Sequence, residues 1–298
     1  MKIGTRGSQL ARRQADWVRA RLAEQGVPAE LVVIETQGDA EVDRPLHELE
    51  GKGFFTKEIE EALLDGRIDI AVHSLKDLPT TLPDGLALAA IPKRHDPRES
   101  LVGGTSLSDL PAGTRIGTSS LRRIAQVRFL RPDLQVVPLR GNVPTRVRKV
   151  ESGDGLDAAL LAIAGLERLE LGNTASLIDP LDVMPAPGQG ALGIEIRADD
   201  RATRKTLTPL HDTGSAAAVS AERAMLAALG GGCQAPVAAF VGAGASGLGP
   251  RLYGRVTAQD GSVQLTASAD IDPRRPEAAG QALASLLEAE GAASLLAR

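Results

Sequence analysis

The chain has little of several residue types that mark common functional classes. Cys233 is its one cysteine in 298 residues, which excludes an internal disulfide. Aromatic residues make up 2 %, so the cores must be built from aliphatic side chains, and a surface of stacked aromatics for single-stranded nucleic acid is not supported. There is no P-loop pattern and no pair of His or Cys residues at metal-ligand spacing. We therefore expect no metal ion.

Charge and hydropathy exclude further classes. The formal net charge is -4, which gives no overall reason to bind nucleic acid or a membrane surface. No window approaches the roughly 18 apolar residues of a membrane span. The first six residues contain no apolar signal region. We expect a cytoplasmic protein with no membrane and no nucleic-acid partner.

Strand and helix patterns alternate over the first two-thirds of the chain. Short apolar runs predict strands at residues 2–5, 29–36, 68–72, 86–91, 115–117, 135–138, 158–161 and 192–196. Apolar residues at helical spacing predict helices at 9–25, 57–65, 121–130, 143–152 and 164–170. This alternation is typical of α/β units with mainly parallel sheets. The Pro-rich, Gly-rich and charged segment 92–111 is predicted to link two such units.

The pattern changes after residue 212. A helix at 216–229 is followed by short strands at 237–241, 251–258 and 263–271, and a helix at 276–296 closes the chain. Strands grouped together and flanked by helices indicate a small α+β domain.

Several strand-to-helix junctions carry residues suited to anions. Ser8, Ser119 and Asn142 stand where helix N-caps are expected, and capping alone would explain each of them. However, nine basic residues lie between Arg115 and Lys149 against one acid, Asp133. Arginine near a helix N-terminus can clamp a carboxylate or phosphate. The pattern therefore favours a site for a small ligand with several negative groups.

A carboxylate and a cation follow the apolar run at 68–72. Lys76 and Asp77 come directly after that predicted strand, and ligand sites in open α/β sheets lie beyond the carboxyl ends of strands. One interpretation is a simple loop pair. The functional interpretation is that Asp77 meets a cationic group of a ligand while Lys76 holds an anion.

Two glycine-rich loops offer further candidates. Cys233 follows three glycines, which leave its thiol little cover, and it is either an exposed cysteine without a role or a point of attachment. Residues 51–57 form a glycine-flanked loop before a helix, which is either an exposed turn or a lid that carries Lys52 and Phe55 over a ligand.

Taken together, these segments resemble the porphobilinogen deaminase family (hydroxymethylbilane synthases). The resemblance spans nearly the whole chain, and its motifs occur in the order of the family. They are GTRGSQLA at 4–11, GKGFF at 51–55, HSLKDLP at 73–79, GTSSLRR at 117–123, LRGNV at 139–143, PGQG at 187–190 and GGCQAP at 231–236.

The resemblance implies a fold of three domains. Two α/β domains like type II periplasmic binding proteins, residues 1–93 with 191–209 and residues 97–185, would hold the active cleft between them. Residues 213–298 would form a small C-terminal α+β domain that carries the cysteine. The family suggests a monomer.

The resemblance also implies a reaction. The family joins four porphobilinogen molecules head to tail, releases ammonia at each step, and yields the linear tetrapyrrole hydroxymethylbilane. The chain grows on a dipyrromethane cofactor held by a thioether, for which Cys233 is the matching residue. Asp77 matches the catalytic carboxylate. The remaining roles implied are cofactor binding by Ser74, Lys76, Thr118, Ser119, Ser120, Arg122 and Arg123, and substrate binding by Arg6, Ser8, Arg140, Arg146, Arg168 and Gln189.

Two other interpretations remain open from the residues alone. A non-catalytic module of the periplasmic-binding-protein type would bind small anions in the same cleft and would not need Cys233. A thiol-dependent transferase would carry a transient, labile adduct on that cysteine instead of a permanent one.

Overall fold

The computed structural model describes residues 1–40, 56–231, 235–243 and 249–296. The chain divides into two compact units, Met1–His95 with Gly190–Ala216, and Asp96–Gln189 with Ala217–Arg298. The second predicted domain and all but the first four residues of the third fall within the same unit. The three-domain division therefore stays a prediction.

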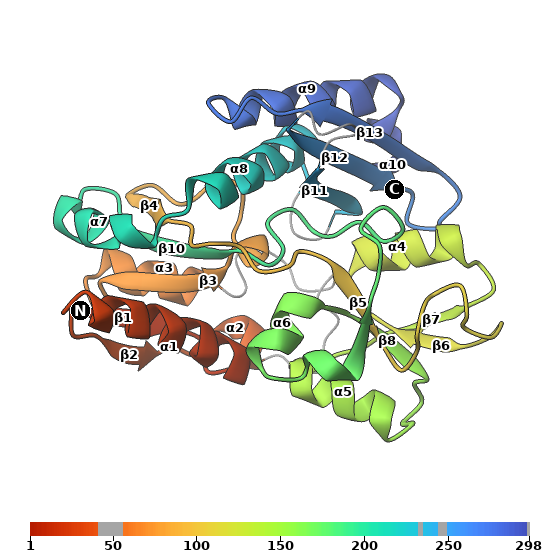
Figure 1. The fold of residues 1–298 in the computed structure, drawn as a ribbon, viewed down its shortest axis with the longest axis horizontal. Coiled ribbons are helices and arrows are strands. Elements are labelled where there is room, and N and C mark those ends of the chain that lie inside the picture. The colour runs from red at the N-terminus through yellow and green to blue at the C-terminus, as the bar shows by residue number, and fades with distance from the viewer. Residues whose placement is uncertain (41–55, 232–234, 244–248, 297–298) are drawn as a thin grey trace. The chain divides into compact units, whose positions relative to one another are not determined.

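The first unit contains a five-stranded sheet in the order β2-β1-β3-β10-β4. The strands β2, β1 and β3 are parallel, and β10 runs antiparallel to both β3 and β4. Figure 1 shows β10, from late in the chain, beside the N-terminal strands. The strands are β1 (Lys2–Thr5), β2 (Glu30–Val33), β3 (Ile70–Ser74), β4 (Leu86–Ala90) and β10 (Leu192–Arg197).

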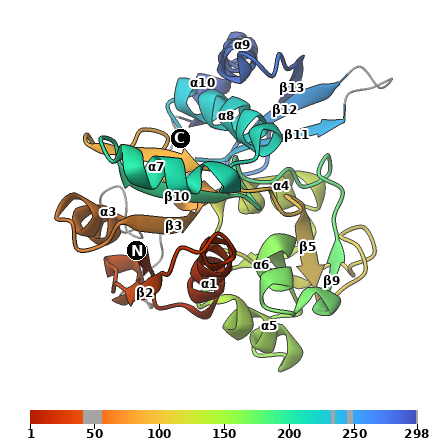
Figure 2. The same ribbon diagram turned by 60° about the vertical axis from the view of Figure 1, so that its left-hand side comes forward.

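Helices cover both faces of this sheet. On β3, Ile70 and Val72 pack in one apolar cluster with Val18 of α1, while Ala71 packs in another with Ile59 of α3 (Figure 2). This follows from the alternation of side chains along a strand. The helices of this unit are α1 (Gln9–Glu24), α2 (Gln37–Ala40), α3 (Lys57–Leu64), the 3₁₀ helix η2 (Leu75–Asp77), α7 (Arg201–Leu207) and the 3₁₀ helix η4 (Thr208–Leu210).

The second unit contains a sheet with the same pattern of strand directions. Its order is β7-β6-β8-β5-β9, in which β7, β6 and β8 are parallel and β5 is antiparallel to both neighbours. The strands are β5 (Glu99–Val102), β6 (Arg115–Gly117), β7 (Gln135–Val137), β8 (Ala158–Ala162) and β9 (Ala175–Leu177).

Three helices flank this second sheet. Val127 of α4 packs with Ile116 and Leu160 of the sheet, whereas Leu166 of α6 packs in a separate cluster with Leu161. Val147 of α5 belongs to that second cluster. The helices are α4 (Leu121–Leu130), α5 (Val143–Glu151), α6 (Ile163–Arg168) and the 3₁₀ helix η3 (Gly172–Thr174).

The prediction of mainly parallel sheets was wrong, because β10 in the first sheet and β5 in the second run antiparallel to both of their neighbours. Two strands were also missed: β5, which lies in the segment 92–111 and is buried along its whole length, and β9. The strand β5 was missed because two of its residues, Glu99 and Ser100, are polar and interrupt the apolar pattern of a buried strand. Ser100 is accommodated by donating its hydroxyl to the carbonyl oxygen of Leu161 at 2.8 Å.

The C-terminal part forms a third, antiparallel sheet of β11 (Val237–Ala243), β12 (Pro250–Thr257) and β13 (Gln264–Asp270). It packs with α8 (Thr213–Ala228), α9 (Pro276–Ala289) and α10 (Ala292–Leu296) (Figure 2). The single helix expected at 276–296 is interrupted at Gly291, whose φ of 100° is readily adopted only by glycine.

The fold class predicted from the sequence is confirmed. Two α/β sheets of matching strand directions are accompanied by a small α+β part. Within the described residues, the helices are all too short or too polar to cross a bilayer.

The contact between α8 and α9 leads to a test of packing. A Cβ at Gly280 would lie 2.3 Å from the carbonyl oxygen of Ala221, a backbone atom that cannot move aside alone. We expect Gly280→Ala to lower the free energy of unfolding by about 1–3 kcal/mol, measured by urea denaturation. Gly214→Ala is the control, because its nearest contact is 3.6 Å away, and an equal loss in both variants would contradict the argument.

Candidate active site

In the first unit, two neighbouring parallel strands end at one edge of the sheet. β1 and β3 pair with Ile3 opposite Ile70, so the residues that follow them emerge on the same side. Arg6 and Ser8 follow β1. Ser74 ends β3, and Lys76 and Asp77 lie in η2 directly after it. The fold thus delivers these five predicted site residues to one edge.

Two leucines hold Lys76 and Asp77 in place. Leu75 and Leu78 are buried, and the amide of Leu75 donates to the carbonyl oxygen of Ala191 at 3.0 Å. The amide of Leu78 donates to Leu75, which closes the 3₁₀ turn. Between these anchors Lys76 and Asp77 are only half-buried. Their charged groups can therefore reach a ligand while the backbone beneath them is fixed.

The two serines of this edge have structural partners. The Ser8 hydroxyl accepts from the amide of Ala11 at 3.3 Å and caps α1. The Ser74 hydroxyl accepts from the side-chain amide of Gln14 at 2.9 Å, and its contact with the Gln14 carbonyl oxygen is 3.3 Å. Capping and a tether to α1 are thus what the structure shows for these hydroxyls. Their predicted roles toward cofactor and substrate stay predictions.

In the second unit, three parallel strands end at one edge. β6 pairs with β7 on one side and β8 on the other, so the junctions after all three strands open on the same side. Thr118, Ser119 and Ser120 follow β6, and Arg140 follows β7. Arg146 lies in α5, and Arg168 ends α6 after β8. Thr118, Ser119, Ser120 and Arg140 therefore share this edge, and Arg146 lies in the first turn of the helix that starts there, whereas Arg168 lies at the far end of α6.

The hydroxyls at this edge shape the start of α4. The Ser119 hydroxyl donates to the carbonyl oxygen of Leu139 at 2.9 Å and accepts from its amide at 3.0 Å. The Thr118 hydroxyl accepts from the amide of Ser120 at 3.2 Å. Ser120 occupies the N-cap position, but within the described chain its side chain makes no capping hydrogen bond. The positive end of α4 is therefore open to an anion.

Arg122 and Arg123 form a buried ion-pair cluster with Glu99. Arg123 donates from Nε and Nη2 to the two carboxylate oxygens at 3.0 and 2.7 Å, and Arg122 donates from Nη2 at 2.6 Å. All three side chains are at most 6 % exposed. Burial lowers the pKa of Arg122, while Glu99 raises it and Arg123 lowers it further. Two cations thus share one carboxylate, and the predicted role of both arginines toward the cofactor stays a prediction.

The other three predicted site arginines of this unit, Arg140, Arg146 and Arg168, are less buried than Arg122 and Arg123. Arg146 donates from Nε to the carbonyl oxygen of Gly141 at 2.7 Å, which places it beside the loop that carries Arg140. The loop ends at Asn142, which caps α5 because its side chain accepts from the amide of Thr145 at 3.0 Å. Burial lowers the pKa of Arg168 to about 10, with Glu167 acting in the opposite direction.

Gln189 is fully buried, and its side-chain amide donates to the carbonyl oxygen of Pro97 at 2.8 Å. This hydrogen bond joins the segment that enters the second α/β sheet to the segment that leaves it. The role of Gln189 toward substrate stays a prediction. Cys233, Lys52 and Phe55 lie outside the described residues.

Several site-supporting residues were not predicted from the sequence. Gln14 is a polar residue on the apolar stripe of α1, and Glu195 interrupts an apolar strand. Both irregularities could have marked them. Glu99 lay in a segment taken as a linker. Arg255 of β12 donates to the carbonyl oxygens of Asp182 and Leu181 and to the Gln126 side chain, and no local pattern marks it.

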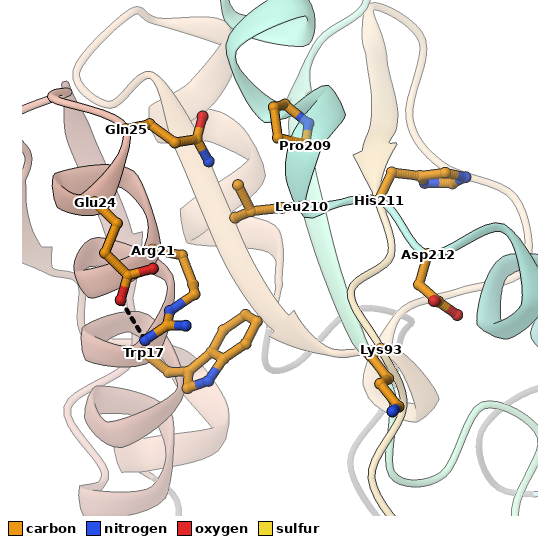
Figure 3. Close-up of a pocket in the computed structure, with 9 residues that line it drawn as sticks. All are labelled: Trp17, Arg21, Glu24, Gln25, Lys93, Pro209, Leu210, His211 and Asp212. Atoms are coloured by element: carbon orange, nitrogen blue, oxygen red, sulfur yellow. Dashed lines mark ion pairs between the residues drawn. The ribbon is translucent and has the colours of Figure 1, made fainter.

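A surface pocket of about 310 Å³ lies in the first unit (Figure 3), and none of the residues that line it is a predicted site residue. Arg21 stacks over Trp17 at 5.9 Å and pairs with Glu24 at 2.5 Å. Asp212 accepts from the amide of Ser215 at 2.7 Å, and hydrogen bonds from the side chain and then the backbone of Ser215 lower the pKa of Asp212. The pocket is lined by Trp17, Arg21, Glu24, Gln25, Lys93, Pro209, Leu210, His211 and Asp212. Most of its charges already have partners, and we assign it no role.

The fold is that of an α/β protein in which polar and charged residues follow the parallel strands of two separate sheets. Two family models match the chain. Residues 1–205 match "Porphobilinogen deaminase, dipyromethane cofactor binding domain", and residues 216–289 match "Porphobilinogen deaminase, C-terminal domain". The chain belongs to the porphobilinogen deaminase family.

Curated relatives agree over nearly the full length. The porphobilinogen deaminase of Moorella thermoacetica is 50 % identical over 301 residues, covering 99 % of this chain and 95 % of the relative. That of Chromobacterium violaceum is 48 % identical over 300 residues, covering 99 % and 96 %. The predicted family and its dipyrromethane cofactor are confirmed by these matches. A non-catalytic anion-binding module is not favoured.

Solved structures of solute-binding proteins are also similar at a low level. An ancestral cationic amino acid solute binding protein matches with a TM-score of 0.45 and 17 % identity, covering 70 % of this chain and 87 % of that one. A methionine-binding lipoprotein of Bacillus subtilis, described as putative, gives a TM-score of 0.42 and 15 % identity, covering 72 % and 91 %. Likeness at this level carries no argument about ligand or mechanism.

The buried cluster at Glu99 leads to a test of stability. Glu99→Gln removes the counter-charge of two buried guanidinium groups, and breaking a buried pair in this way is expected to cost about 3–5 kcal/mol of the free energy of unfolding. Asp157→Asn is the control, because its pair with Arg115 is exposed to solvent and should matter little. Denaturation curves showing equal losses would refute the distinction.

Proposed function

We propose that this chain joins four porphobilinogen molecules head to tail, with release of ammonia, into hydroxymethylbilane on a dipyrromethane cofactor. The observation that carries the proposal is the placement of the family's motif residues at the carboxyl ends of parallel strands in both α/β sheets. Membership of the family supplies the substrate and the reaction.

The charge of the second unit fits an acidic cofactor. Each pyrrole unit carries an acetate and a propionate, so two condensed units bring several carboxylates. The cluster of Arg122, Arg123 and Glu99 carries one excess positive charge in a buried setting, and the start of α4 lacks a side-chain cap within the described chain. Arg168 is a desolvated cation. These groups favour carboxylates as partners because a buried charge needs compensation.

We assign the cofactor to a thioether with Cys233, and its binding to Ser74, Lys76, Thr118, Ser119, Ser120, Arg122 and Arg123. When bound, the cofactor supplies the primer on which the new chain grows. Incoming substrate would be bound by Arg6, Ser8, Arg140, Arg146, Arg168 and Gln189. Lys52 and Phe55 are assigned to a lid. These roles rest on the family motifs and on the positions of the described residues.

Asp77 is assigned the electrostatic role. Loss of ammonia from porphobilinogen leaves positive charge on the pyrrole, and attack by the next ring moves that charge onto the attacking pyrrole. A carboxylate about 4 Å from such a charge stabilises it by roughly 4 kcal/mol at an effective dielectric constant of 20. The rigid anchoring of η2 by Leu75 and Leu78 keeps the carboxylate in position without reorganisation.

We also propose a cellular compartment, an oligomeric state and a partner for this protein. The absence of a spanning helix among the described residues and the family's chemistry agree with a protein that works in the cytoplasm. We propose that it acts as a monomer of three domains, residues 1–93 with 191–209, 97–185 and 213–298. Porphobilinogen is its proposed partner, and no nucleic acid is involved.

The covalent cofactor can be tested by intact-mass measurement. The purified protein should be heavier than its sequence by two condensed pyrrole units. In Cys233→Ser this increment should be absent, because the thioether cannot form. An unmodified protein that still consumes porphobilinogen would overturn the proposal.

The role of Asp77 can be tested by kinetics. Asp77→Asn should retain the mass increment while kcat falls roughly 100-fold or more, because the charge that stabilises the cationic transition state is lost. Asp84→Asn, an exposed change shortly after η2, is the control and should behave as the native protein. Near-native kcat in Asp77→Asn would remove Asp77 from the mechanism.

A further inference from the structure

Three ionisable residues lie between the first sheet and α3. On β3, Ala71 packs with α3, and His73 is two residues further on the same face. On β10, Ile194 and Ile196 pack on the opposite face, so Glu195 between them points to the α3 side. Glu60 of α3 is buried and faces the sheet. We refer to His73, Glu195 and Glu60 as the buried cluster.

The contacts of the buried cluster are incomplete. Nε2 of His73 lies 3.1 Å from Oε2 of Glu195, with side chains 3 % and 0 % exposed. The other oxygen of Glu195, Oε1, is buried and has no hydrogen-bond partner among residues that the structure describes. The same holds for Oε1 of Glu60. Two buried carboxyl oxygens thus lack the partner that buried polar atoms normally have.

Two ionised carboxylates beside one imidazole would leave uncompensated charge in a buried space. A proton on one of them removes that charge and also supplies a donor for an orphaned oxygen. Burial is the largest influence on the pKa of Glu60 and raises it, and the nearby Glu195 raises it further. The Thr56 hydroxyl and His73 act in the opposite direction and lower it. Burial, the largest of these effects, thus favours the neutral, protonated form of Glu60.

We propose that Glu60 is a protonated carboxylic acid that shares a hydrogen bond with Glu195, directly or through one buried water, and that this cluster positions the end of β3. His73 is bound to Glu195 on the other side. Glu60, Glu195 and His73 are positioning residues, since they act on the site through the backbone that carries Lys76 and Asp77.

The path from the buried cluster to Asp77 is short. His73 is followed by Ser74, whose hydroxyl is tied to Gln14 of α1, and then by Leu75, whose amide is tied to Ala191. The bond from His73 to Glu195 is the deepest of these ties, because both side chains are buried. Displacement of the carboxylate by as little as 1 Å can cost a large part of a catalytic rate.

Other titratable groups near α3 do not replace Glu60. β4 brings no ionisable side chain, and Lys2 of β1 and Glu30 of β2 are exposed. Arg197 of β10 donates to the carbonyl oxygens of Leu63 and Ile68. Oε1 of Glu58 accepts from the amide of Gln37 at 2.9 Å, while its Oε2 is buried and has no hydrogen-bond partner among the described residues. In α3, Lys57 and Glu61 are exposed.

The proton on Glu60 is tested by infrared difference spectroscopy of the full chain at neutral pH. The difference between native protein and Glu60→Gln should contain the carbonyl stretch of a protonated carboxylic acid. The difference for the control Glu61→Gln, an exposed neighbour in the same helix, should contain only carboxylate bands. A carboxylate signal from Glu60 would overturn this part of the proposal.

Thermal unfolding gives a second readout. With a raised pKa, unfolding releases the proton of Glu60 at pH values between its ordinary 4.5 and the raised value. The Tm of the native protein should therefore fall, relative to that of Glu60→Gln, as pH rises through this range. Parallel Tm curves for the two proteins would contradict a proton held by Glu60.

The positioning role rests on the proposed function and is tested by Glu195→Gln. We expect the mass increment to be retained, KM to change less than about twofold and kcat to fall roughly tenfold, with an altered pH profile. A merely structural role would lower Tm and leave kcat of the folded protein unchanged, which would overturn the positioning. If Glu195→Gln does not fold, His73→Asn serves in its place. A native protein that consumes no porphobilinogen would contradict the proposed function. The infrared test of the proton on Glu60 does not depend on that function.

Discussion

Parallel strands that end at a common edge are the constraint on which the rest of this molecule depends. Each α/β sheet has three parallel strands side by side, so loops distant in sequence open together. In the first unit this joins the segment after β1 to the segment that carries Asp77. In the second it gathers the hydroxyls before α4 with arginines from later helices. The site chemistry then follows from which residues occupy those few loop positions.

Buried charge is the second organising feature, and it is used differently in the two units. In the second unit Glu99 serves two arginines, so positive charge is left over where an acidic ligand is proposed. In the first unit two carboxylates accompany one imidazole, so negative charge is in excess and a proton is proposed to remove it. In both cases the cluster is centred on a glutamate in a buried strand, Glu99 in β5 or Glu195 in β10.

The sequence was sufficient for elements whose pattern is local. The helix at 121–130, the strand at 115–117 and the junctions that carry the family motifs were predicted because spacing, caps and glycines mark them. β5 was missed because its polar half is satisfied only by partners far along the chain, Arg122 and Arg123 for Glu99 and Leu161 for Ser100. The antiparallel direction of β10 was missed for a related reason, since strand pairing is decided by tertiary contacts. Pairings such as His73 with Glu195, 122 positions apart, cannot be derived from local pattern.

The position of β10 in the first sheet has a consequence for biosynthesis. β4 pairs with β10 alone in that sheet, and β10 is also the partner that covers the second edge of β3. Yet β10 begins at Leu192, after the whole sequence of the second α/β sheet. During translation, β1, β2 and β3 can assemble early, while β4 must wait for roughly a hundred further residues before it has a neighbour. The nascent chain thus carries an open strand edge for that interval, and closure of the first sheet comes only when the ribosome has passed the second.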